Sequence, residues 1–96
     1  MTTVRVSTSA ENEFTAALCW YADHSHVVAE AFDSEFDRTL AKIAAQPDGF
    51  PKCDERNRYV LMRRFPYQII FRKIGDTVTI IAVAHTAREP GYWDNR

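Results

Sequence analysis

The spacing of apolar residues changes once along the chain, and this change limits the folds that the chain can adopt. Between Ala10 and Ile43 apolar residues recur at every third or fourth position, which is the period of a helix. From Tyr59 to His85 the sequence is instead rich in Tyr, Val, Ile, Phe and Thr, which favour strands. Helices followed by strands indicate an α+β fold, with the helices on one face of a sheet.

Two helices are predicted in the first half. Ser9 is the expected N-cap of the first helix, and Pro47 ends the second because the residue before a proline disfavours helical backbone. A polar break at 23–26 separates two apolar stripes, so the helices should form an antiparallel hairpin. The first stripe is Ala10, Phe14, Ala17, Leu18, Tyr21 and Ala22. The second is Ala29, Phe32, Phe36, Leu40 and Ile43.

Four strands are predicted, one before the hairpin and three after it. The expected strands are 4–6, 59–64, 67–73 and 77–85. The short connections between the last three require antiparallel neighbours, so the sheet should be mostly antiparallel. The segment 77–84 is apolar on both faces, as in a covered central strand. A chain of 96 residues has room for one domain, so we expect a single α+β domain over residues 1–96.

Charge is unevenly distributed although it nearly cancels overall. The net charge of −1 argues against a general nucleic-acid binder, which would be strongly basic. Up to Glu55 there are four basic and ten acidic residues, whereas from Arg56 onward there are eight basic and three acidic residues. The split is consistent with one face for an anion or an acidic partner, or with mutual neutralisation across the fold.

The segment 85–96 concentrates side chains that can carry function. It holds His85, Arg88, Tyr92, Trp93 and Arg96 within twelve residues, just after a buried strand. Arginines beside aromatic rings can hold phosphate and stack on a base, or can form the centre of a protein interface. Trp93 and Tyr92 could equally cover the open end of the core. His85 could transfer protons near neutral pH, or could be a polar residue hydrogen-bonded inside the fold.

Arg63, Arg64 and Arg72 form a second candidate set, on two neighbouring strands. Successive strand residues point to opposite faces, so at most one of Arg63 and Arg64 can join Arg72. These arginines could bind a partner, or could be a solvated edge that discourages aggregation.

The sequence lacks the motifs that characterise several classes of protein. It contains no GxGxxG, GxxxxGK[ST] or GxSxG motif, so nucleotide binding through those motifs and serine hydrolysis are unsupported. His24 and His26 with Cys19 match no recognised zinc spacing, so we expect no metal site and no cofactor. The sequence has no apolar run long enough to span a bilayer and no signal peptide, so we expect no membrane partner and a cytoplasmic location.

Two motifs and the order of elements together resemble the RelE/ParE superfamily of toxin–antitoxin toxins. The segment 63–72, RRFPYQIIFR, resembles that superfamily's "RFPY-x-I-x-F/Y-R" strand pair. The segment 80–93, IIAVAHTAREPGYW, resembles its closing "I-x-x-V-x-H-x-x-R-x-P-x-Y-W" pattern. The helical hairpin ending at Pro47 also matches the layout of the superfamily. The resemblance extends over nearly the whole chain.

The resemblance implies a plasmid- or chromosome-borne bacterial toxin that arrests growth and is held in a hetero-oligomer by a cognate antitoxin. ParE-like members poison DNA gyrase and have no known hydrolytic chemistry. RelE-like members are metal-independent endoribonucleases that cleave mRNA on the ribosome. The low net charge is poor for docking on ribosomal RNA, so we favour the ParE-like branch and a protein that is not an enzyme.

The candidate residues differ between these two branches. In a nuclease the site would comprise Arg64, Arg72, His85, Arg88 and Tyr92. The residues expected to bind the target or the antitoxin are Arg63, Arg64, Arg72, Arg88, Tyr92, Trp93 and Arg96.

Overall fold

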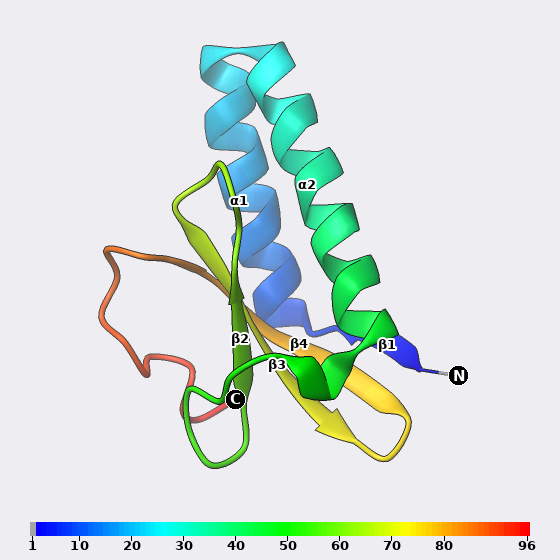
Figure 1. The fold of residues 1–96 in the computed structure, drawn as a ribbon. Helices are drawn as coiled ribbons and strands as arrows, with labels where there is room; N and C mark the ends of the chain where they lie inside the picture. The colour runs from blue at the N-terminus through cyan, green and yellow to red at the C-terminus, as the bar shows by residue number, and fades with distance from the viewer. Residues whose placement is uncertain (1) are drawn as a thin grey trace.

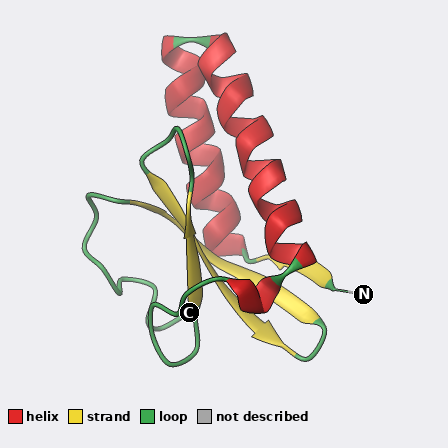
Figure 2. Ribbon diagram, in the orientation of Figure 1, coloured by secondary structure: helices red, strands yellow, loops and turns green. Residues whose placement is uncertain are grey.

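A computed structural model describes residues 2–96 and confirms the α+β architecture. In chain order the elements are β1 (Thr3–Val6), α1 (Thr8–His24), α2 (His26–Ala45), a 3₁₀ turn η1 (Pro47–Gly49), β2 (Arg58–Leu61), β3 (Tyr67–Ile74) and β4 (Thr77–His85). Figure 1 shows α1 and α2 side by side on one face of the sheet, with the end of the hairpin extending beyond it. Coloured by element type, the C-terminal segment is a loop that leaves β4 on the side away from α2 (Figure 2).

The helical hairpin has a tighter connection than the sequence predicts. Ser7 rather than Ser9 is the N-cap of α1, because Ser7 has extended backbone directly after β1 and its side chain accepts the N–H of Ala10. Ser25 alone separates the helices. Its N–H donates to the carbonyl of Tyr21, and its side chain accepts the N–H of Val28, so one residue ends α1 and begins α2.

The sheet has four strands in the order β1-β4-β3-β2. β1 pairs parallel with β4, in the register Val6 to Ile80, and the other two pairs are antiparallel. A mostly antiparallel sheet is therefore confirmed. A β-bulge between Ile70 and Phe71 shifts the register of β3 against β4. β4, which pairs on both sides, is the central apolar strand, as predicted.

β2 is shorter than predicted and ends at Leu61. Arg63 and Arg64 lie in the turn between β2 and β3, so the prediction that they alternate along a strand is wrong. The N–H groups of both residues donate to the carboxylate of Glu35 on α2 instead of to a neighbouring strand. The ladder therefore stops before Pro66, which has no N–H to contribute.

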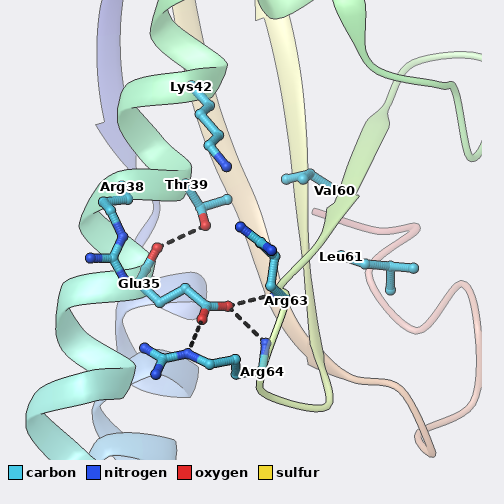
Figure 3. A pocket seen from close by; sticks show the side chains of 8 residues that line it. All are labelled: Glu35, Arg38, Thr39, Lys42, Val60, Leu61, Arg63 and Arg64. Atoms are coloured by element: carbon cyan, nitrogen blue, oxygen red, sulfur yellow. Dashed lines mark hydrogen bonds and ion pairs between the residues drawn. The ribbon is translucent and has the colours of Figure 1, made fainter.

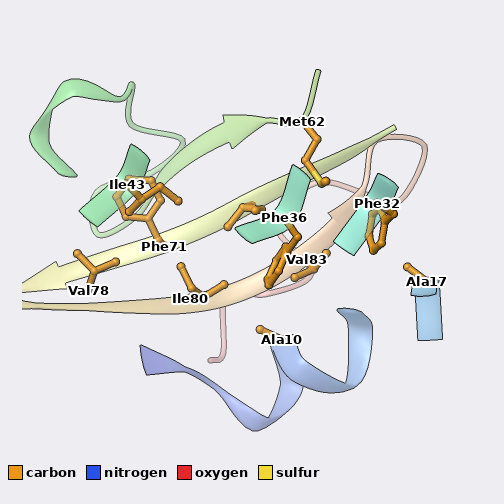
Figure 4. Packing of buried hydrophobic residues seen from close by; sticks show 11 residues of the cluster. Ala10, Ala17, Phe32, Phe36, Ile43, Met62, Phe71, Val78, Ile80 and Val83 are labelled. Carbon is orange, nitrogen blue, oxygen red and sulfur yellow. The ribbon is translucent and has the colours of Figure 1, made fainter. Parts of the chain in front are cut away.

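The core lies between the hairpin and the sheet, and a second cluster lies on the other face. Figure 4 shows the first cluster, in which Phe32, Phe36 and Ile43 of α2 pack on Phe71 and Ile80 of the sheet and on further buried residues. The second cluster comprises Ile70, Ile81, Ala82, Ala84 and Trp93. Trp93 is only 5% exposed, so the C-terminal segment covers the face of the sheet that the helices leave free.

Candidate functional site

A groove with a volume of about 610 Å³ lies between α2 and the β2–β3 turn. We call it the α2–β2 groove (Figure 3). Polar side chains of α2 form one wall, and β2 with the turn that follows forms the other. The lining residues are Glu35, Arg38, Thr39, Lys42, Val60, Leu61, Arg63 and Arg64.

Glu35 joins the two walls of this groove. Its Oε2 accepts the N–H of Arg63 at 2.6 Å and that of Arg64 at 3.2 Å, and its Oε1 accepts Nε of Arg64 at 3.2 Å. Burial by itself would raise the pKa of the Glu35 carboxyl, but these donors outweigh burial and hold the pKa below its usual value. Glu35 therefore stays ionised and fixes the turn against α2.

Three cations of the groove have no carboxylate partner among residues 2–96. Arg64 is neutralised by Glu35, whereas Arg38, Lys42 and Arg63 form no ion pair in the described part of the chain. Beside them, Leu61 is 57% exposed on the free edge of the sheet. The N–H of Met62 donates to Tyr67 of β3, so the backbone groups of Leu61 point away from β3, toward the open edge. The groove thus combines positive charge, an apolar side chain and an unpaired strand edge.

The predicted tail residues gather around a second helical carboxylate, Glu13 of α1. Arg96 Nη1 lies 2.8 Å from Glu13 Oε1, and Arg88 Nη1 lies 3.2 Å from Oε2. The hydroxyl of Tyr92 donates to Oε2 at 2.7 Å, and the N–H of Val83 donates to Oε1 at 3.0 Å. Glu13 therefore ties the C-terminal segment both to α1 and to β4.

Tyr92 lies between these charged groups. The guanidinium of Arg88 lies 3.6 Å above its ring centroid, and that of Arg96 lies 5.1 Å away. Burial first, and then the hydrogen bond to the Glu13 carboxylate, raise the pKa of the Tyr92 hydroxyl far above its usual value. The phenol therefore keeps its proton throughout the physiological range.

A polar network holds the other side of the C-terminal segment. Asp54 accepts the side-chain amide of Asn57 at 2.9 Å and the indole N–H of Trp93 at 3.4 Å. Arg72 Nε donates to the buried Asn57 at 3.0 Å, and its Nη1 donates to the carbonyl of Arg96 at 3.4 Å. Arg72 thus connects β3 to the C-terminal segment and lies apart from the α2–β2 groove.

The structure divides the predicted residues between four places. Arg63 and Arg64 line the α2–β2 groove, Arg72 belongs to the Asn57 network, and Arg88, Tyr92 and Arg96 surround Glu13. His85 is exposed at the end of β4, where its Nδ1 accepts the N–H of Ala87 and its ring meets Tyr67 edge-on. The five nuclease candidates therefore do not share one site.

Sequence reasoning missed the acidic partners of these arginines. Glu13 lies three positions after Ala10, and Glu35 lies three positions after Phe32, so each occupies its helix's apolar stripe. An acid at such a position is buried and needs a cationic or N–H partner, and this was the available signal. Pairing of Arg64, Arg88 and Arg96 with helical acids cancels part of the charge split across the fold.

Two further features limit the chemistry of the described residues. Among residues 2–96 no three His, Cys, Asp or Glu side chains gather as a metal site would require. None of the helices in that range is both long enough and apolar enough to cross a bilayer.

Comparison with known families gives one clear match. The model of the family described as "ParE toxin of type II toxin-antitoxin system, parDE" matches residues 4–90, which is most of the chain. The match extends from β1 through both helices and all the strands to Pro90, so it includes the elements that build the groove, and Glu13 and Arg88 of the Glu13 cluster, while Tyr92 and Arg96 lie beyond it.

Individual relatives agree with this match. Proteins named Toxin ParE2 from two strains of Mycobacterium tuberculosis, CDC 1551 and H37Rv, are each 24% identical over 88 residues, covering 91% of this chain and 84% of theirs. A solved structure titled "Chromosomal ParDE TA system from P. aeruginosa" superposes with a TM-score of 0.74 at 18% identity. It covers 88% of this chain and 96% of that chain, which establishes the fold.

Proposed function

Because the chain belongs to the ParE toxin family of type II toxin–antitoxin systems, we propose that it arrests growth by inhibiting DNA gyrase. The chain is the toxin of its system, and a cognate antitoxin is its partner. The proposal takes residues 1–96 as a single toxin domain that acts in the cytoplasm.

The arrangement around Glu13 supports inhibition over RNA cleavage. Cleavage of RNA needs one group to remove a proton and another to supply one. Tyr92 is half-buried, donates a hydrogen bond to Glu13 and has a strongly raised pKa, so it is unsuited to either task. Arg64, Arg72 and Arg88 each donate a hydrogen bond to a protein oxygen, and Arg64 and Arg72 lie in other parts of the structure than the exposed His85.

The antitoxin is best accommodated by the α2–β2 groove. Arg38, Lys42 and Arg63 attract acidic side chains, and the backbone of Leu61 offers an N–H and a carbonyl to an extended segment. Arg64 already forms an ion pair with Glu35, so it contributes less to binding an acidic segment. Of the residues predicted for binding, this assigns Arg63 and Arg64 to the antitoxin side. It leaves for the target Arg88 with Tyr92, Trp93 and Arg96 of the C-terminal segment, together with Arg72 of β3, which donates to the carbonyl of Arg96.

A supercoiling assay tests the gyrase proposal. Relaxed plasmid is incubated with gyrase, ATP and increasing amounts of purified chain, with heat-unfolded chain as the control. We expect supercoiling to fall as the chain is added and to be unaffected by the unfolded control. The RelE-like alternative would be established by two results together. Supercoiling would continue undisturbed at a large molar excess of the chain, and primer extension after induction would detect codon-linked cuts in mRNA.

A further inference from the structure

A second groove lies on the opposite side of the hairpin, between α1 and the end of β4. Its volume is about 280 Å³. Ala16 and Trp20 of α1 form one wall, and Tyr67, Val83, His85 and Arg88 form the other. We call it the α1–β4 groove. It shares no lining residue with the α2–β2 groove.

The floor of this groove is an unpaired strand edge. β1 ends at Val6, opposite Ile80, so no strand lies beside the last residues of β4. The N–H of Val83 donates to Glu13 instead of to a strand, and that of Thr86 donates to Pro66 on the β3 side. Antiparallel strands alternate their hydrogen-bonding direction, so the carbonyl of Val83 and the N–H of His85 face the open edge.

The walls combine aromatic rings with a cation. Trp20 is 59% exposed, although a large indole of a helix normally packs into the core. It is held in position because it stacks on His24 with centroids 4.2 Å apart and meets Tyr21 edge-on at 5.3 Å. At the other end the side chain of Arg88 is 54% exposed and is fixed by Glu13 and by the ring of Tyr92.

The charge of the α1–β4 groove determines which chemical groups it can bind. Arg88 and Arg96 share the single charge of Glu13, so the cluster retains one positive charge, and its exposed part is Arg88. A partner group placed between Arg88 and the exposed His85 should therefore be a carboxylate. An exposed, pre-positioned Trp with an Arg nearby is also the composition of interface hot spots.

We propose that the α1–β4 groove is the surface that contacts the target protein, binding an extended acidic segment along the free edge of β4 with Trp20 as the apolar anchor. This rests on the proposed function only in that the chain acts by binding a protein. Antitoxin and target then use separate surfaces on the two sides of the hairpin.

Trp20→Ala tests the proposal, with Ile74→Ala as the matched control because Ile74 is a 71% exposed apolar residue at the far end of β3. We expect Trp20→Ala to raise the concentration for half-inhibition of supercoiling at least about tenfold, as for an interface anchor. Ile74→Ala should inhibit supercoiling at nearly the same concentration as the unaltered chain. Both variants should keep the melting temperature and the affinity for the antitoxin, measured by calorimetry.

Three results would overturn the proposal. Trp20→Ala could inhibit as strongly as the unaltered chain, or could lose antitoxin affinity as much as inhibition, which would make this the antitoxin's groove. It could also weaken binding of a single-stranded oligonucleotide, which would assign the groove to nucleic acid. If the unaltered chain does not inhibit gyrase, growth arrest after induction replaces supercoiling as the readout. A weaker arrest by Trp20→Ala than by Ile74→Ala would then support the groove while the gyrase proposal fails.

Discussion

Replacing Glu35 by alanine should destabilise the fold more than any other change to a helical acid except at Glu13. The substitution leaves the N–H groups of Arg63 and Arg64 without their acceptor and unties the β2–β3 turn from α2. A hydrogen bond to a charged group contributes about 1.5–3 kcal/mol. The ion pair adds little because the Arg64 side chain is 61% exposed. Since water can reach the opened groove, we expect a loss of about 2–4 kcal/mol in the free energy of unfolding.

That loss is large for a domain of this size. A stability of roughly 0.05–0.15 kcal/mol per residue gives about 5–14 kcal/mol in total. Each kcal/mol corresponds to about 4–8 °C in a domain of up to 100 residues, so the melting temperature should fall by roughly 10–30 °C. Thermal unfolding followed by circular dichroism measures it. Glu30→Ala is the control, because Glu30 is an exposed acid on the same helix with no ion pair in the described structure.

The pH dependence provides a second test of Glu35. Its pKa is lower in the folded than in the unfolded chain, so its contribution is fully present above the ordinary value of 4.5 and is lost as pH falls through the folded value. The difference in stability between the unaltered chain and Glu35→Ala should therefore be constant near neutral pH and should shrink below about pH 4.5. The reasoning is refuted if Glu35→Ala and Glu30→Ala have the same melting temperature. It is also refuted if the difference in stability between the unaltered chain and Glu35→Ala grows as the pH is lowered.

Two other changes have expected outcomes. Reversing charge in the α2–β2 groove with Arg38→Glu and Lys42→Glu together should lower affinity for the antitoxin by at least about tenfold in calorimetry. Arg5→Glu on the opposite edge strand should leave that affinity unchanged, and an equal loss in both would assign the effect to net charge. Trp93→Ala should cost about 3–5 kcal/mol of stability, because Trp93 is buried in the second core cluster. Any relief of growth arrest by Trp93→Ala should therefore accompany a lower melting temperature, and relief at an unchanged melting temperature would place Trp93 in an interface.

The sequence was sufficient to predict the elements and the family but not the partners of the charged residues. Phe32, Phe36 and Ile43 were identified by spacing, because burial on one helix face leaves a periodic record. The position of β1 beside β4 depends on tertiary contacts between residues 74 positions apart, such as Thr3 and Thr77, and no local pattern encodes them. Arg64 and Arg72 appeared to be equivalent surface cations, yet one pairs with a helical acid and the other with a buried amide.

The order of strands in the sheet determines when this toxin becomes competent. β4 contacts both β1 and β3, and it is the last of the four strands to leave the ribosome. Long-range pairings of this kind form late because the intervening chain must first be closed into a loop. Until β4 emerges, β1 has no partner and the hairpin has no central strand to cover. A nascent chain should therefore be inactive until β4 has emerged, and toxicity should begin only when the sheet is complete and the antitoxin can capture it.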